Sequence, residues 1–125
     1  MPRAEPRPAA TTERVATKAV VRAASRLGLS NKALAKIIGV SEATVSRMGA
    51  GSYTLTAGDK PFELGLLFVR LFRALDAISG GDEAVAATWL RRENLALGAV
   101  PLTLIESVSG LVQVLGYLDA RRALA

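Results

Sequence analysis

Basic side chains recur at every fourth position near the start of the sequence, at Arg14, Lys18, Arg22 and Arg26. Because this spacing is close to one turn of an α-helix, it predicts a helix with a single positive stripe on its outer face. Like charges at this spacing repel each other, and an anionic surface would relieve that repulsion. The simpler alternative, a basic face that only contacts water, stays open.

The sequence of 125 residues contains neither cysteine nor histidine, and these two absences exclude several kinds of site. Disulfides, Cys/His zinc sites and catalytic relays built on Cys or His are all ruled out. We therefore expect no enzyme, no cofactor and no metal site. Asp82-Glu83 is better explained as a helix start than as a catalytic pair of carboxylates, and Gly49-Ala50-Gly51-Ser52 lacks the lysine of a nucleotide-binding loop.

The charge is divided unevenly along the chain. Residues 1–60 contain ten Lys and Arg against four Asp and Glu, whereas residues 61–125 contain six against seven. A basic half beside a neutral, apolar half suggests one part that binds a polyanion and another that binds protein. The longest charge-free stretches have 12 residues, too short to cross a membrane, and the first residues lack a secretory signal. We expect a soluble, cytoplasmic protein.

Hydrophobic periodicity predicts an all-α fold without any β-hairpin. Residues 1–11 hold three of the five prolines and predict a disordered tail, in which Arg3 and Arg7 could alternatively reach DNA. Helices are expected over residues 13–27, 62–78, 83–93, 103–109 and 111–123, with Val85 and Trp89 facing the core. Thr103 and Glu106 could form a capping box, although Pro101 could start that helix earlier.

Residues 30–48 predict two short helices joined by a tight turn. Ser30 and Ser41 stand where N-caps are expected, and Gly39 can take the positive φ that ends a helix. Ala35 is small enough for the second helix to cross closely, with Val45 pointing back at it. This pattern resembles the helix-turn-helix of Xre-type regulators, and the resemblance rests on Leu34, Ala35, Gly39, Val45 and Gly51.

A helix-turn-helix places the N-terminal residues of its second helix at base edges in the major groove. The resemblance implies that Arg47 binds a guanine edge, that Thr44 contacts a thymine methyl, and that the first helix begins at a phosphate. Glu42 is more simply explained by the helix dipole. Gly49 could make the second helix fray early. The implied DNA-binding residues are Ser30, Asn31, Lys32, Ser41, Glu42, Ala43, Thr44, Ser46 and Arg47.

The segment that follows residue 88 resembles the C-terminal toxin-binding domain of Xre/MbcA/ParS-type antitoxins. The resemblance rests on Trp89-Leu90, Asn94-Leu95-Ala96-Leu97-Gly98, Pro101-Leu102 and Gly110, placed after an Xre-type helix-turn-helix as in that family. It implies an antitoxin that neutralises a RES-domain toxin acting on NAD or transferring ADP-ribose. It also implies a homodimer or a higher hetero-oligomer with the toxin, and repression of the antitoxin's own operon through operator double-stranded DNA.

The domains would then be a disordered tail (1–11), a helix-turn-helix domain (12–58) and a helical dimerisation and toxin-binding domain (59–125). We expect the last helix to occlude the toxin's active site, because an apolar stretch there runs into a basic end. The expected toxin contacts are Leu111, Leu115, Leu118, Arg121 and Arg122. The alternative is a stand-alone Xre-family repressor whose C-terminal half only dimerises or senses a signal.

Overall fold

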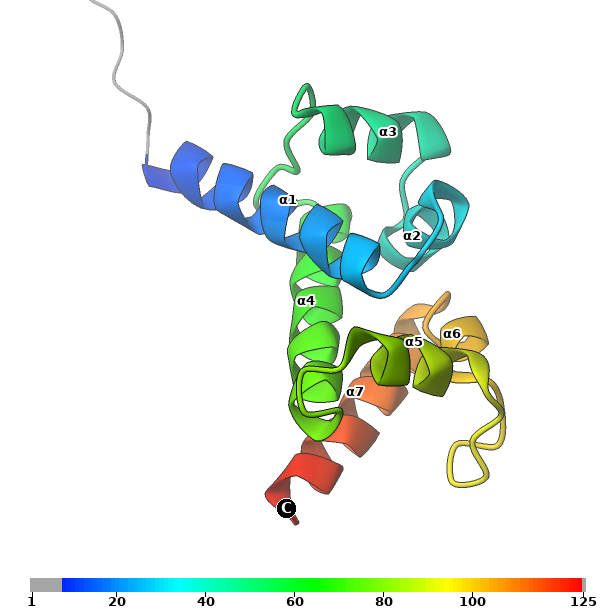
Figure 1. Ribbon diagram of the computed structural model, residues 1–125. Helices are drawn as coiled ribbons and strands as arrows, with labels where there is room; N and C mark the ends of the chain where they lie inside the picture. Colours follow the sequence, from blue (N-terminus) through cyan, green and yellow to red (C-terminus); the bar gives the residue numbers. More distant parts are fainter. Residues whose placement is uncertain (1–7, 125) are drawn as a thin grey trace, which may run out of the picture.

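The computed structural model describes residues 8–124, and this part of the chain forms seven helices (Figure 1). Between residues 8 and 124 there is no β-strand, only one isolated bridge between Asn94 and Ala99. The predicted all-α class is therefore confirmed. The helices are α1 (Pro8–Arg26), α2 (Asn31–Ile38), α3 (Glu42–Ala50), α4 (Lys60–Ile78), α5 (Glu83–Arg91), α6 (Pro101–Leu104) and α7 (Val108–Ala123).

Helix α1 begins at Pro8, earlier than the sequence pattern predicts. The fixed φ of proline suits the first turn of a helix, and two alanines, which favour helix, follow directly. The expectation of a disordered tail over residues 1–11 is thus corrected for residues 8–11. Arg3 and Arg7 lie outside the described residues.

Helices α2 and α3 are capped as the sequence predicts. Ser30 Oγ accepts a hydrogen bond from the Ala33 amide at 3.1 Å, and Ser41 Oγ accepts one from the Thr44 amide at 3.0 Å. Gly39 ends α2 in the left-handed conformation, with φ of 76°. Side chains from both helices, among them Ala35 and Val45, are buried in the common core. These caps fix the turn between the two helices.

Helix α4 joins the two halves of the molecule. It contacts α1, α2 and α7, and Figure 1 shows it descending from α1 toward the C-terminal helices. Phe68, Leu71 and Leu75 of α4 are almost fully buried in one continuous core. Although α4 is long and apolar, no helix of the described region could cross a membrane.

A second link between the halves is made by Arg91 at the end of α5. Its Nη2 donates hydrogen bonds to the carbonyl oxygens of Leu27 and Gly28, both at 3.0 Å, and its Nη1 donates to the carbonyl of Ala87 at 2.8 Å. The carbonyls at the end of a helix lack partners within that helix and carry a partial negative charge. A guanidinium from the C-terminal half therefore caps the end of α1.

The last two helices differ from the predicted pieces over 103–109 and 111–123. α6 starts at Pro101 without a side-chain cap, so the predicted capping box of Thr103 and Glu106 does not form. α7 instead starts at Val108, where Ser107 Oγ accepts the Gly110 amide at 3.1 Å. Gly110 lies inside the first turn, and only glycine fits there because a Cβ would lie 1.8 Å from the carbonyl oxygen of Leu104. Sequence alone could not distinguish this close approach from a helix break.

Candidate functional site

The polar residues predicted to bind DNA gather at the start of α2 and along α3. All of them are exposed except Thr44, which is half-buried. Ser41 Oγ donates to Thr44 Oγ1 at 2.9 Å, and Arg47 Nη2 donates to the same Thr44 oxygen at 3.1 Å. The side chains of Ser41, Thr44 and Arg47 therefore lie on one side of α3. Their hydroxyl and guanidinium groups are already oriented by hydrogen bonds to one another.

Arg47 has a second support that the sequence analysis missed. Its guanidinium carbon lies 5.8 Å from the centre of the Tyr53 ring, a distance at which a cation and an aromatic face attract each other. A side chain held in one orientation before binding loses less entropy on binding. The only signal in the sequence was an aromatic residue in an otherwise polar turn.

The end of α3 is also better ordered than predicted. The helix continues through Gly49 to Ala50, and Gly51 closes it with φ of 79°. The Ser52 amide donates to the Arg47 carbonyl at 2.9 Å, and the Gly51 amide donates to the Met48 carbonyl at 3.1 Å. These bonds satisfy the last carbonyls of the helix, so the expected early fraying at Gly49 is wrong.

The loop that carries Tyr53 is tied to α1 through a buried threonine. Thr17 is 4% exposed; its Oγ1 donates to the Glu13 carbonyl at 2.8 Å and accepts the Leu55 amide at 2.9 Å. A buried hydroxyl needs such partners because an unpaired polar group in the core is costly. Thr17 thus fixes the loop that in turn places Tyr53 beside Arg47.

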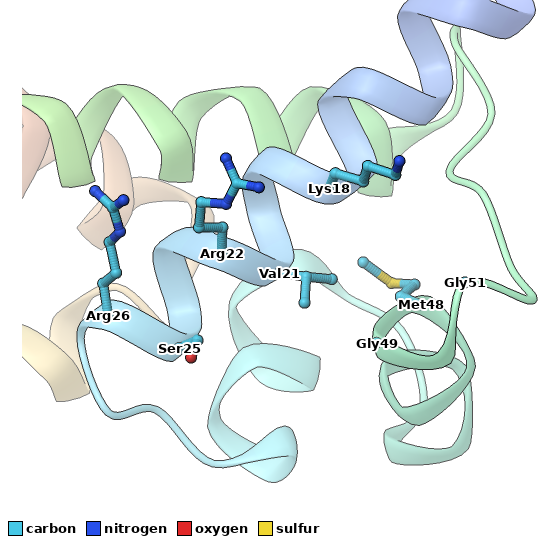
Figure 2. Close-up of a pocket in the computed structure, with 8 residues that line it drawn as sticks. All are labelled: Lys18, Val21, Arg22, Ser25, Arg26, Met48, Gly49 and Gly51. Atoms are coloured by element: carbon cyan, nitrogen blue, oxygen red, sulfur yellow. The ribbon is translucent and has the colours of Figure 1, made fainter.

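The basic stripe of α1 is exposed over all four of its residues. Lys18, Arg22 and Arg26 line a cleft of about 530 Å³ between α1 and the end of α3, where Gly49 and Gly51 leave the surface open (Figure 2). Within the described chain, only Arg26 of the stripe forms an ion pair, with Glu83 at 3.8 Å. The other cations stay available to an anionic partner.

The residues predicted to bind a toxin fall into two groups. Leu111, Leu115 and Leu118 are buried in the core, where α7 packs on α4, which corrects the expectation that they face a partner. Arg121 and Arg122 are exposed, as predicted. The helical spacing of apolar residues along α7 therefore indicated the face that packs in the core. A surface that contacts a toxin has to lie elsewhere.

An aromatic pair lies beside the exposed end of α7. The rings of Trp89 and Tyr117 stack with their centres 6.2 Å apart and an angle of 17° between their planes. Arg121 Nη1 donates to the Tyr117 hydroxyl at 3.0 Å, and its guanidinium lies 5.8 Å from the ring centre. Hydrogen bonds from Arg121 and then Asn94 lower the pKa of Tyr117 below its ordinary value. Trp89 is half-buried at the edge of the core.

The neighbouring face of α5 is more open than predicted. Val85, expected to face the core, is 51% exposed, and it lines a shallow cleft with Trp89 and Asn94. No group of three or more acidic side chains within residues 8–124 could hold a metal ion.

Comparison with known families covers almost the whole chain. Residues 6–70 match the antitoxin Xre-like helix-turn-helix domain, and residues 74–123 match the antitoxin Xre/MbcA/ParS C-terminal toxin-binding domain. A comparison with curated proteins gave no match. The two matched segments meet inside α4, the helix that contacts both halves. The chain thus belongs to the Xre-like antitoxin family, and it combines a helix-turn-helix DNA-binding domain with a toxin-binding domain.

Proposed function

We propose that this antitoxin neutralises a RES-domain toxin, one that acts on NAD or transfers ADP-ribose, and represses its own operon by binding operator DNA. The observation that carries the proposal is the order of the two matched domains in one short chain. The RES class follows from the sequence resemblance, and a homodimer or a larger complex with the toxin belongs to the same proposal. We assign no catalytic activity to the chain.

For the DNA-binding half, we infer that α3 enters the major groove. Arg47, already oriented by Thr44 and Tyr53, would bind a guanine edge through two hydrogen bonds. Ser30, Asn31 and Lys32 at the start of α2 would contact a phosphate, where free backbone N–H groups favour an anion. The other predicted DNA-binding residues of α3 would supply the remaining base contacts. Glu42 would mainly stabilise the positive end of the helix dipole.

For the toxin-binding half, the exposed basic end of α7 supports a contact with an acidic surface or with a pocket that holds phosphates. Arg121 and Arg122 are the predicted contacts that remain exposed. We infer that they lie at the edge of the toxin's active site, and that the buried leucines of α7 position them from within. The predicted division of the chain at residues 58 and 59 stays part of this proposal.

Co-expression tests the proposal directly. The chain is expressed in cells together with the RES-domain protein encoded by a neighbouring gene, and growth is compared with cells that carry the toxin alone. We expect full rescue of growth and, in gel-shift assays, binding to the DNA upstream of the operon. Binding to that DNA without any rescue would instead favour the stand-alone repressor.

A further inference from the structure

A short ordered loop between α5 and α6 presents a leucine to solvent. The Asn94 amide donates to the Ala99 carbonyl at 3.0 Å, and the Gly98 amide donates to the Asn94 carbonyl at 2.8 Å. The Asn94 side-chain oxygen accepts the Leu97 amide at 3.1 Å. These bonds close the loop on itself, so the residues at its tip are held in one conformation.

Leu95 at the tip is 95% exposed, whereas Leu97 two residues later packs against the core. A leucine at the tip of an ordered loop does not stabilise the isolated chain, because its apolar surface stays in water. Its side chain is available to any pocket that can enclose it, and the fixed backbone means that little entropy is lost when it inserts.

Leu95 follows Asn94, which lines the cleft with Val85 and Trp89 and bonds to Tyr117 through its side chain. We call the mixed apolar and cationic surface around this loop the loop patch: Val85, Trp89, Asn94, Leu95, Tyr117 and Arg121. Stacked aromatic rings and arginine are the side chains that most often dominate protein interfaces. Arg92 and Glu93 line the cleft beside Trp89, and Arg121 bonds to Tyr117, so the charged side chains that these contacts place at the patch are two arginines and one carboxylate. Charge complementarity therefore calls for a partner with an apolar pocket and an acidic rim.

The position of the patch separates it from DNA. Figure 1 shows the loop at the end of the molecule remote from α3, beyond α5 and α6. If α3 occupied the major groove of DNA, Leu95 would therefore stay accessible to another partner. The patch also lies within residues 74–123, which match the toxin-binding domain.

We propose that Leu95 is the central apolar contact with the toxin, inserting into a pocket on the toxin surface while Arg121 pairs with an acidic group at its rim. This inference rests on the proposed function. It shifts the main contact from the buried face of α7 to the loop in front of it.

The test measures binding of the purified RES-domain protein to the full-length antitoxin and to Leu95 variants by calorimetry. Leu95→Ala should weaken binding about 10- to 100-fold, as expected for loss of a buried leucine side chain. Leu95→Asp should weaken it further, because a carboxylate would enter an apolar pocket. Leu95→Met, which keeps the apolar volume, should bind within a few-fold of the wild type.

Val112→Asp provides the matched control. Val112 is 53% exposed on α7 but lies five residues before Tyr117, hence on a different side of that helix. It should bind the toxin like the wild type. Thermal melts and gel shifts of all variants should be unchanged, because neither residue supports the core or α3.

Three results separate the possibilities. If the wild-type chain does not bind the RES-domain protein, the proposed function fails and this inference fails with it. If the wild type binds and Leu95→Asp binds equally well, only the inference is overturned. If Leu95→Asp abolishes self-association of the antitoxin while toxin binding persists, the patch joins two copies of the chain, and the inference is equally overturned.

Discussion

The α3 surface and the loop patch differ in the kind of side chain that they expose. On α3, Ser41, Thr44 and Arg47 are polar and are oriented by hydrogen bonds among themselves. In the loop patch, Leu95 and the Trp89–Tyr117 pair offer apolar and aromatic surface on a backbone fixed by its own bonds. The difference matches their partners, because DNA presents phosphates and base edges whereas a protein surface offers pockets.

In the toxin-binding half, a buried and an exposed leucine should respond very differently to substitution. The loss of stability at the buried one is the largest effect that we expect. Leu118→Ala should lower the free energy of unfolding by about 2–5 kcal/mol, because it leaves a cavity between α7 and α4. Leu95→Ala should change it by less than about 0.5 kcal/mol. Urea denaturation measures both. Equal losses for the two variants would contradict the assignment of Leu95 to the surface.

Loss of the guanidinium on α3 should be felt almost as strongly, but only in DNA binding. Arg47→Ala should weaken binding to operator DNA by about 1–3 kcal/mol, because a two-bond contact with guanine is lost. Gel-shift titrations at several salt concentrations measure the effect. Arg122→Ala removes the same charge in the last turn of α7, which Figure 1 shows at the opposite end of the molecule from α3, and is the control. Equal affinity of both variants for the operator would remove Arg47 from the interface.

The link between the two halves can be broken at Arg91. Arg91→Ala removes three hydrogen bonds, two of them to the end of α1, and should lower the free energy of unfolding by about 1–3 kcal/mol. The neighbouring Arg92→Ala should cost less than about 0.5 kcal/mol. Thermal or urea unfolding of the two variants gives the comparison. If both were equally stable, the contact with α1 would not hold the halves together.

The smallest effect concerns the cation beside the aromatic pair. Arg121 is the main cause of the lowered pKa of Tyr117, so Tyr117 loses its proton at a lower pH than an ordinary tyrosine. Arg121→Gln should raise that pKa and shift the phenolate absorbance to higher pH. Tyr117→Phe identifies which part of the titration belongs to this residue. An unshifted curve in Arg121→Gln would show that the contact is not maintained in solution.

The sequence predicted the α3 region more fully than the loop patch. Around α3, the signals are local: Ser30, Ser41 and Gly39 all act within one or two turns of their own helix, and each takes the predicted role. Tyr53 was missed because its partner Arg47 is brought near by the fold of the loop.

In the C-terminal half the decisive contacts are between distant elements. Apolar periodicity in α7 could not distinguish whether Leu111 and Leu118 face α4 or a partner. A core and a protein interface are both built from apolar side chains, and the structure shows that these leucines are buried. The exposure of Leu95 depends on a loop closed by Asn94 and Ala99, and the role of Arg91 depends on the end of α1. Such contacts cannot be obtained from the spacing of residues along one element.

The central claim is that DNA and toxin bind to two separate surfaces of this chain. It is tested most directly by measuring Arg47→Ala and Leu95→Asp in both assays, operator binding and binding of the RES-domain protein. We predict that Arg47→Ala lowers only the affinity for DNA and that Leu95→Asp lowers only the affinity for the toxin. A loss of both affinities in either variant, with its fold intact, would contradict the account.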